Sequence, residues 1–256
     1  MGDLGRARMD DRGVMVVTGG NRGIGAAVSA KAAAAGWRVA ILYRERADEA
    51  GALVERIRAA GGQAKAFRAD VSREADVVAA FEAASGLGPI TALVNNAGIT
   101  GGVSRVTDVQ ADTLERVLAV NVLGAFLCAR EAVRRMSTSR GGAGGSIVNV
   151  SSGASRTGTP GVWVHYAATK GAMDTMTLGL AKEVAAEGIR VNAVRPGLID
   201  TEIHADRPPG QLERVLRAVP MGRIGTADEI ADTILWLASP QAAYVNGALL
   251  DAAGGL

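Results

Sequence analysis

Metal sites and disulfide frameworks need cysteine and histidine, and this sequence has little of either. Its 256 residues include one cysteine, Cys128, and two histidines. A single cysteine cannot form an internal disulfide, and no Cys/His cluster has zinc-like spacing. Cys128 lies in the apolar run LGAFLCAREAV, where we expect a small buried hydrophobe. The sequence therefore predicts a protein without a metal centre.

Long hydrophobic runs and a strong excess of one charge are also missing. No stretch approaches the roughly 18 apolar residues of a transmembrane helix. The polar N-terminus MGDLGRARMDDRG lacks the apolar core of a secretory signal. The formal net charge is +2, too small to indicate nucleic acid or an anionic membrane as a partner. We expect a soluble, cytoplasmic protein.

Aromatic residues are scarce, at 4%, although hydrophobic residues make up 48% of the chain. Alanine, valine, leucine and glycine carry the apolar content, which suits close packing of helices on a sheet. Short apolar runs, typical of buried strands, alternate with longer helical patterns. Strands are expected within residues 14–20, 38–44, 63–71, 90–98, 145–152, 188–197 and 247–255, and helices within 26–36, 47–62, 73–88, 112–136, 166–187 and 227–239.

This alternation predicts an α/β fold: a parallel sheet of about seven strands with helices on both faces. Right-handed crossovers then give a doubly wound, Rossmann-like sheet. No repeat or linker divides the chain, so residues 1–256 are expected to form a single dinucleotide-binding domain. Residues 197–225 follow a strand end on the ligand side of such a sheet and form a candidate substrate lid. An ordered surface loop is the alternative.

A glycine-rich turn, TGGNRGIG, joins the first strand to the first helix. Glycine permits positive φ angles and lets a phosphate approach the backbone, and the following helix directs free N–H groups and its positive dipole end at the anion. The turn has no GK[ST] sequence, so it is not a Walker loop. On a strand–turn–helix it indicates a dinucleotide site. The expected contacts are Gly19, Asn21, Arg22, Gly23, Ile24 and Gly25.

The end of the second strand, LYRER, bears on the choice of dinucleotide. A site for unphosphorylated ribose usually places an acid there, whereas here Tyr43 and Arg44 occupy that position and Arg22 lies in the glycine turn. Two guanidiniums suit a 2′-phosphate. NADP(H) is therefore favoured, while the neighbouring Glu45 keeps NAD(H) open.

Further motifs follow in order along the chain: ADV, NNAG, VNVLGAF, IVNVSS, YAATK, RVNAVRPG and a terminal DAAGG. With the glycine turn they span residues 14–255, and together they resemble the short-chain dehydrogenase/reductase family. The chain is similar to bacterial glucose dehydrogenase-like and 3-oxoacyl-carrier-protein reductase-like enzymes. The resemblance implies hydride transfer between NAD(P) and a carbonyl or alcohol, usually by a homotetramer.

The same resemblance assigns residues. It implies that Asp70 and Val71 hold the adenine and that Asn95, Ala97 and Gly98 line the path of the cofactor. Pro196, Gly197, Ile199 and Thr201 would contact the nicotinamide end, where Tyr166 and Lys170 also lie. The implied catalytic set is Asn121, Ser152, Tyr166 and Lys170, in which Asn121 helps a water chain to reach the lysine.

The residues themselves give a reason for the Tyr–Lys pair. Tyr166 and Lys170 are four residues apart on an expected helix, so both project from one face. A free phenol has a pKa near 10, and a nearby ammonium favours the phenolate. Tyr166 can then donate a proton to a carbonyl oxygen, or remove one from an alcohol. A serine hydroxyl would hold the substrate oxygen.

Three serines compete for that last role. The family's usual spacing, counted back from Tyr166, falls on Gly153, which has no hydroxyl. Ser155 is too close to the tyrosine, and the adjacent Ser151 and Ser152 face opposite ways on a strand. The ending IVNVSS favours Ser152, with one extra residue in the segment TPGVWV.

Alternatives remain at the level of function. The leading hypothesis is an NADP(H)-dependent oxidoreductase, and the rival is a dinucleotide-binding redox sensor; a methyltransferase is disfavoured by the proton relay. Among enzymes, a 3-oxoacyl-carrier-protein reductase and a sugar or polyol dehydrogenase both stay open. Trp163 is a candidate for lining the pocket, and His165 and His204 are weaker candidates for contact with substrate.

Overall fold

A computed structural model describes residues 12–202 and 210–256. It contains a seven-stranded sheet in the order β3-β2-β1-β4-β5-β6-β7, in which every neighbouring pair is parallel. The strands are β1 (Val14–Thr18), β2 (Arg38–Tyr43), β3 (Gln63–Arg68), β4 (Ile90–Asn95), β5 (Gly145–Val150), β6 (Ile189–Pro196) and β7 (Leu249–Ala252). The predicted single-domain, doubly wound α/β fold is confirmed.

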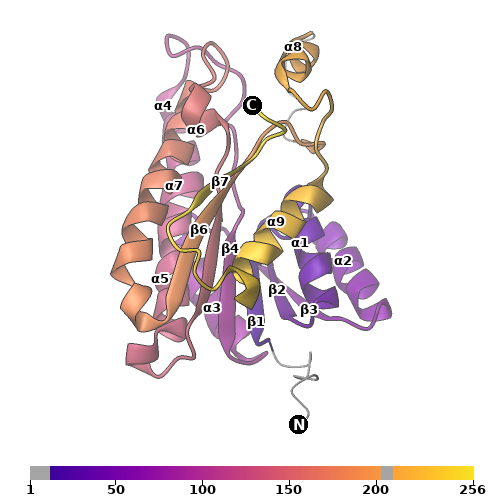
Figure 1. Ribbon diagram of the computed structural model, residues 1–256, viewed down its shortest axis with the longest axis vertical. Helices are drawn as coiled ribbons and strands as arrows, with labels where there is room; N and C mark the ends of the chain where they lie inside the picture. Colours follow the sequence, from indigo (N-terminus) through magenta and orange to yellow (C-terminus); the bar gives the residue numbers. More distant parts are fainter. Residues whose placement is uncertain (1–11, 203–209) are drawn as a thin grey trace.

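Helices cover both faces of the sheet (Figure 1). Helices α1, α2 and α9 pack on one face, and α3, α5 and α7 on the other. The bounds are α1 (Gly23–Ala34), α2 (Ala47–Ala59), α3 (Glu74–Ser85), α4 (Ala111–Leu118), α5 (Gly124–Met136), α6 (Ala154–Thr157), α7 (Val164–Glu183), α8 (Gln211–Ala218) and α9 (Ala227–Ala238). Across residues 12–202 and 210–256, every helix falls short of the length and hydropathy that a membrane span requires.

The apolar strands supply two cores, one on each side of the sheet. Along β1, Val14 and Val16 belong to the core beneath α3, α5 and α7, whereas Met15 and Val17 belong to the core beneath α1, α2 and α9. Successive strand residues point to opposite faces, so a strand buried on both faces is apolar throughout. Cys128 is fully buried in the first core, as expected.

The long helical stretch expected over 112–136 is not one regular helix. It divides into α4, a π-helical turn η1 (Ala119–Leu123) and α5. Such a turn inserts one residue into the helical repeat and is frequent at functional sites. Asn121 lies in this turn and is fully buried.

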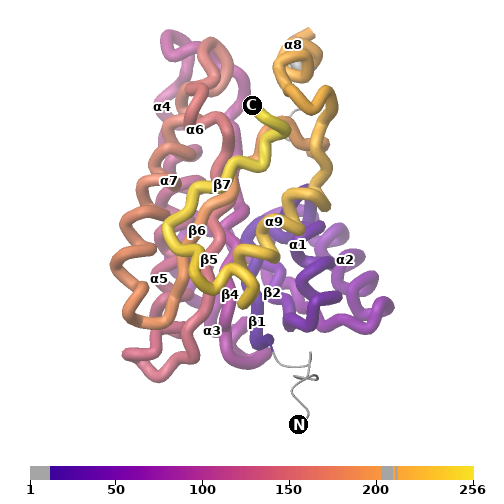
Figure 2. Tube along the Cα trace, in the orientation of Figure 1, coloured from indigo at the N-terminus to yellow at the C-terminus, as the bar shows by residue number. Residues whose placement is uncertain are grey.

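The order of the strands reverses between β1 and β4, because β2 and β3 lie to one side of β1 and β4 to β7 to the other. Ligands of doubly wound sheets bind at the carboxyl ends of the strands beside such a reversal. Helices α6 and α8 and the C-terminus lie beyond this edge, as the chain trace shows (Figure 2). The segment expected as a lid contains α8, and its residues 203–209 lie outside the described part of the chain.

Candidate active site

A cavity of about 610 Å³ opens at the carboxyl edge of the sheet. Segments far apart in sequence meet there: the start of α1, the ends of β4, β5 and β6, α6, the start of α7, and α8. Its walls are mostly apolar. Its lining includes the predicted Ile24, Gly98, Ser152, Tyr166, Lys170, Pro196, Gly197, Ile199 and Thr201, together with Asn96, Arg156, Val162, Trp163, Leu198, Arg214, Val215 and Leu256.

Tyr166 and Lys170 lie one turn apart on α7, and both are buried, with 7% and 3% of their surface exposed. The Nζ atom of Lys170 lies 5.6 Å from the centre of the Tyr166 ring. The ring of Trp163 packs edge-on against Tyr166, with ring centroids 6.0 Å apart. The phenol is thus held between an apolar wall and a cation.

Lys170 is anchored at the end of β5. Its ammonium donates a 2.7 Å hydrogen bond to the carbonyl oxygen of Val150. Burial lowers the pKa of Lys170 from 10.5 to about 8, because the charged form loses its hydration, and the negative charge of Asp174 acts in the opposite direction. At neutral pH the lysine therefore remains a cation, and its proton is held less tightly than that of an exposed lysine.

Asn121 joins three segments around the lysine. Its Oδ1 atom accepts a hydrogen bond from the backbone N–H of Ile99, and its Nδ2 atom donates to the carbonyl oxygen of Ile99 and to the hydroxyl of Thr169. A Cβ atom on Gly98 would lie 3.4 Å from Asn121 Oδ1 and 3.5 Å from Lys170 Nζ. Gly98 therefore keeps open the space between the two side chains.

The two adjacent serines differ in their surroundings. The hydroxyl of Ser151 is buried and donates to the backbone oxygen of Lys170 at 3.2 Å. The hydroxyl of Ser152 is half-buried, accepts a hydrogen bond from the backbone N–H of Ala154 and borders the cavity. Because that contact uses Ser152 as an acceptor, its hydroxyl proton stays available for a substrate oxygen. Ser155 instead donates to the carbonyl oxygen of Ser152.

The glycine turn is tightly built. Gly19 and Gly23 have positive φ angles of 58° and 51°, and a Cβ atom on Gly25 would lie 2.2 Å from the carbonyl oxygen of Gly19. The backbone of this turn therefore tolerates only glycine at these positions. The side chain of Asn96 donates to the carbonyl oxygens of Thr18 and Gly19 and holds the turn against the end of β4.

Asn21 fastens the same turn to β2. Its Nδ2 atom donates to the carbonyl oxygens of Glu45 and Arg46, and Arg46 adopts a left-handed backbone conformation before α2. This contact places the β2–α2 loop, with its arginines, beside the start of α1.

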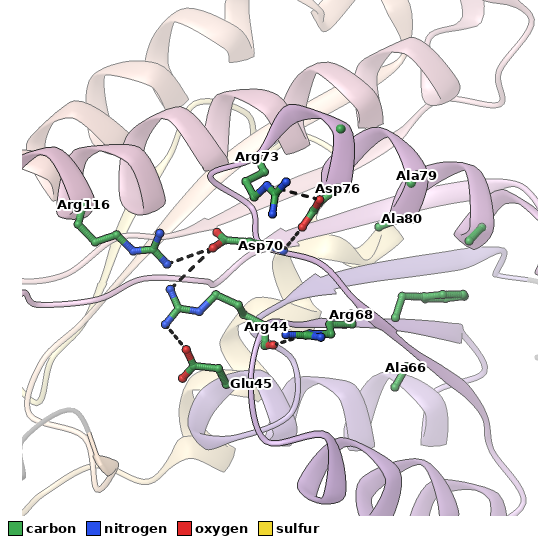
Figure 3. Close-up of a pocket in the computed structure, with 13 residues that line it drawn as sticks. Arg44, Glu45, Ala66, Arg68, Asp70, Arg73, Asp76, Ala79, Ala80 and Arg116 are labelled. Atoms are coloured by element: carbon green, nitrogen blue, oxygen red, sulfur yellow. Dashed lines mark hydrogen bonds and ion pairs between the residues drawn. The ribbon is translucent and has the colours of Figure 1, made fainter.

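Arginines gather around Asp70 in a second, open cavity of about 1070 Å³ (Figure 3). Arg44 at the end of β2 pairs with Glu45 at 2.5 Å and lies 3.9 Å from Asp70. Arg116 of α4 pairs with Asp70 at 3.1 Å. Asp70 also accepts hydrogen bonds from the backbone and hydroxyl of Ser72. Arg44 thus lies at the cavity that also contains Asp70, the residue expected to contact the adenine.

The other arginine expected to contact a phosphate, Arg22, pairs with Glu202 at 2.9 Å. Glu202 also pairs with Arg46 at 2.9 Å, and the two guanidiniums lower its pKa. The first helical turn and the β2–α2 loop therefore present three arginines, Arg22, Arg44 and Arg46, in contact with carboxylates at the protein surface.

The remaining predicted cofactor residues occupy different places. Asn95 is buried and donates to Asn149 and to the backbone of Ala125, so its side chain lies in the core. The backbone N–H of Ala97 donates to the hydroxyl of Thr18. Val71 packs in the core beneath α3 and α5. Tyr43 is half-buried and is the last residue of β2. Its carbonyl oxygen accepts a hydrogen bond from the backbone N–H of Ala69.

Trp163 and His165, two of the residues considered for contact with substrate, lie in different surroundings. Trp163 is 3% exposed and lines the cavity. The imidazole of His165 lies 2.7 Å from the carbonyl oxygen of Thr100 and ties α7 to the loop after β4. His204 lies outside the described residues.

Sequence reasoning missed two groups of residues. Asn96 follows Asn95 in the NNAG motif, and only the strand register shows that it faces the turn and the cavity while Asn95 faces the core. Asp174 and Arg195 form a buried ion pair, but they are 21 residues apart on different elements. A separation of this kind forms no sequence pattern that would predict their contact.

Comparisons with known proteins agree with this geometry. Residues 19–256 match the family model described as Enoyl-(Acyl carrier protein) reductase. The chain is 51% identical to the uncharacterized oxidoreductase YgfF of Escherichia coli, over 94% of this chain and 99% of that protein. It is 36% identical to the 3-oxoacyl-(acyl-carrier-protein) reductase FabG of Staphylococcus aureus, over 94% and 96%. A blue fluorescent protein from a metagenomic library, solved in complex with NADPH, superposes with a TM-score of 0.88 at 36% identity, over 96% and 98% of the two chains.

Proposed function

The chain belongs to the short-chain dehydrogenase/reductase family, and we propose that it is an NADP(H)-dependent enzyme that moves hydride between nicotinamide and a carbonyl or secondary alcohol. The observation that supports this most strongly is the convergence of Ser152, Tyr166 and Lys170 on one cavity at the carboxyl edge of the sheet. Ligands of such sheets bind at this edge.

The residues of this chain fit a dinucleotide. Gly19, Gly23 and Gly25 lie in a turn that requires glycine at these three positions and leads into the first turn of α1, where backbone N–H groups and the helix dipole favour a pyrophosphate. Asp70 is held by Ser72 and Arg116 on the adenosine side. Pro196, Gly197, Ile199 and Thr201 border the opposite end, next to Tyr166. The cofactor supplies or accepts the hydride.

In this proposal Tyr166 is the acid and base. During reduction its phenol donates a proton to the carbonyl oxygen, and in the reverse direction the phenolate removes the proton of the alcohol. The ammonium of Lys170 favours the phenolate, because opposite charges attract strongly in a buried site. The hydroxyl of Ser152 donates a hydrogen bond to the same substrate oxygen and stabilises its developing negative charge. Asn121 holds Ile99 and Thr169 and so positions the lysine.

We further propose that Arg22 and Arg44 hold a 2′-phosphate. In the protein alone they pair with Glu202 and Glu45. These pairs lie at the surface, where ion pairs contribute little stability, so a dianionic phosphate can replace the carboxylates. The structural relative solved with NADPH supports this choice.

Within the family, the shape of the cavity favours an apolar carbonyl compound over a sugar. Val162, Trp163, Leu198, Ile199 and Val215 provide apolar walls, whereas a polyol needs many hydrogen-bonding partners. The 3-oxoacyl-(acyl-carrier-protein) reductase relative is in keeping with this preference. NADPH oxidation measured over ketoacyl thioesters, aromatic ketones and sugars would rank the substrate classes.

The test of the proposal is the substitution Tyr166→Phe. It removes the proton donor and keeps the ring that packs on Trp163, so carbonyl reduction should fall by about 10²–10⁴-fold while NADPH binding persists. Tyr244→Phe, at an exposed position, is the matched control. Unchanged turnover in the Tyr166 variant would contradict the mechanism. NADPH binding without turnover of any carbonyl or alcohol by the unaltered protein would favour the redox-sensor alternative.

A homotetramer is the proposed assembly. Exposed apolar side chains at Leu118, Leu123 and Phe126 follow one another along α4, η1 and α5, and Trp236 of α9 and Tyr244 near β7 are exposed as well. Contiguous exposed apolar surface is typical of subunit interfaces. Light scattering will give the mass of the particle. The cytoplasmic location expected from the sequence and the lid role of residues 197–225 stay predictions, which cell fractionation and loop truncation can address.

A further inference from the structure

A buried ion pair lies beside the proton relay. Asp174 of α7 and Arg195 of β6 are joined by two hydrogen bonds, because Nε and Nη2 of the arginine both donate to Oδ2 of the aspartate at 3.0 and 2.9 Å. Only 10% of the aspartate side chain and 16% of the arginine side chain are exposed. Burying two charges costs free energy, so this pair needs an explanation.

Asp174 shares a helix face with the relay. Tyr166, Lys170 and Asp174 follow one another at four-residue intervals along α7, and residues at this spacing lie one above another on a helix. All three are buried. The charged groups linked to this face are Asp174 itself, Arg195 of β6 that pairs with it, and Asp251 of β7 and Arg156 of α6, which continue the pairing; β5 contributes the uncharged Ser151, whose hydroxyl contacts the backbone of Lys170.

The second oxygen of Asp174 remains uncompensated. Its Oδ1 atom is buried and has no hydrogen-bond partner among the described residues. A buried polar atom without a partner is uncommon and calls for an explanation. The guanidinium of Arg195 therefore fixes one oxygen of the carboxylate and leaves part of its negative charge to act on its neighbours.

The pair continues into a chain of alternating charges. The Nη1 atom of Arg195 lies 3.7 Å from Asp251 of β7, and Asp251 pairs with Arg156 of α6 at 2.7 Å. Arg156 lines the substrate cavity. Arg195 thus contacts two carboxylates, Asp174 and Asp251. Through these contacts Asp174, on the helix that carries the relay, is linked to the rim of the cavity.

We propose that Asp174, clamped by Arg195, is a positioning residue that keeps Lys170 in its charged form. This role rests on the proposed function, because it serves the relay between Lys170 and Tyr166. The lysine is buried, and burial favours its neutral form because the charged form loses its hydration. Asp174 supplies the opposing negative charge.

The electrostatic surroundings of Lys170 act in the direction that this role requires. Burial lowers the pKa of Lys170 to about 8, and Asp174 raises it. A lysine that lost its proton below neutral pH would no longer favour the phenolate of Tyr166. A purely structural tie between α7 and β6 would leave the protonation of the lysine unchanged, so the two roles make different predictions.

The composition of the chain makes a direct measurement simple. Lys31, Lys65, Lys170 and Lys182 are the four lysines of the sequence, so NMR of the protein with ¹³Cε-labelled lysine gives four signals, and Lys170→Arg identifies one of them. Titration of the Asp174→Asn variant should show the pKa of Lys170 lower by about one pH unit, and Asp174→Glu should restore most of it. Asp232→Asn is the matched control, because it removes the carboxylate 2.7 Å from Lys31 and should lower the pKa of Lys31 alone.

The outcomes are distinct. An unchanged Lys170 titration in a folded Asp174→Asn variant would overturn the proposal. If that variant does not fold, the double variant Asp174→Asn/Arg195→Gln is compared with Arg195→Gln alone, so that the comparison isolates the carboxylate; the pKa of Lys170 should be lower in the double variant, and equal values would equally overturn the proposal. In the active protein, the alkaline limb of kcat/KM for reduction should move to lower pH by a similar amount. The NMR titration does not depend on turnover, so a failure of the proposed function, seen with Tyr166→Phe, is distinguishable from a failure of this role.

Discussion

Lys170 on α7 donates its 2.7 Å hydrogen bond to Val150, the last residue of β5. The contact joins the helix that carries Tyr166 to the strand whose end carries Ser151 and Ser152. It therefore fixes the position of the ammonium relative to both the phenol and the serine hydroxyls, although β5 and α7 are separated by a loop and the short helix α6.

The two serines offer a matched pair of substitutions. Ser152→Ala removes the hydroxyl that borders the cavity, and we expect kcat for carbonyl reduction to fall by about 10²-fold, the usual effect of losing one oxyanion donor. Ser151→Ala removes a buried hydrogen bond to the backbone of Lys170. It should lower the free energy of unfolding by about 1 kcal/mol and leave most activity. Steady-state kinetics and urea unfolding of both variants will show this, and the reverse pattern would assign the catalytic role to Ser151.

Cofactor preference should depend on Arg44. Arg44→Gln would remove the proposed charge-assisted contact to the 2′-phosphate, worth about 1.5–3 kcal/mol, which corresponds to a loss of roughly 10–150-fold in kcat/KM for NADPH. The value for NADH should change little. Arg58→Gln on the exposed face of α2 is the control. Comparable kcat/KM for NADH and NADPH in the unaltered enzyme would reject the NADP(H) assignment.

Two glycine substitutions should act in opposite directions on stability. Gly25→Ala would place a Cβ atom 2.2 Å from the backbone oxygen of Gly19, so we expect it to cost more than about 2 kcal/mol and to weaken NADPH binding. Gly51→Ala lies in the exposed part of α2, where nothing comes within 4 Å of the new atom. There alanine should add about 0.5–1 kcal/mol, because it has the higher helix propensity. Chemical unfolding of both variants measures the difference, and equal effects would contradict the close approach in the turn.

The buried Lys170 should make the free energy of unfolding depend on pH. Its pKa is about 8 in the folded protein, below the ordinary value of 10.5. Below pH 8 both states carry the proton and the cost of burying the charge is fully present. Between about pH 8 and 10.5 the unfolded state binds more protons, so the free energy of unfolding should rise with pH.

Lys170→Met removes this dependence. At pH 7 we expect the variant to be more stable by on the order of 2 kcal/mol and to lose activity, because the relay loses its cation. Urea unfolding from pH 7 to 10.5 is the measurement, with Lys182→Met as the control for the loss of a lysine on the same helix. A Lys170 variant that is less stable at pH 7 and keeps the same pH slope would refute the depressed pKa.

Several properties of this protein followed from the sequence alone. Apolar runs alternating with helical patterns determined a parallel sheet covered on both faces, because only strands buried on both sides are apolar throughout. The glycine turn between the first strand and the first helix predicted where a phosphate would approach, and the structure has the strand–turn–helix that this prediction needs. Helical periodicity put Tyr166 and Lys170 on one face of α7.

Other properties were decided by tertiary structure. A strand buried on both faces gives no pattern that tells its two sides apart, so only packing separated Asn95, which lies in the core, from Asn96, which holds the turn. The π-helical turn at Asn121 depends on contacts with Ile99 and Thr169, which local propensity does not encode. The pair of Asp174 with Arg195 forms only when α7 packs on β6. Arg195 comes from a different element, so no spacing along α7 records that Asp174 has this partner.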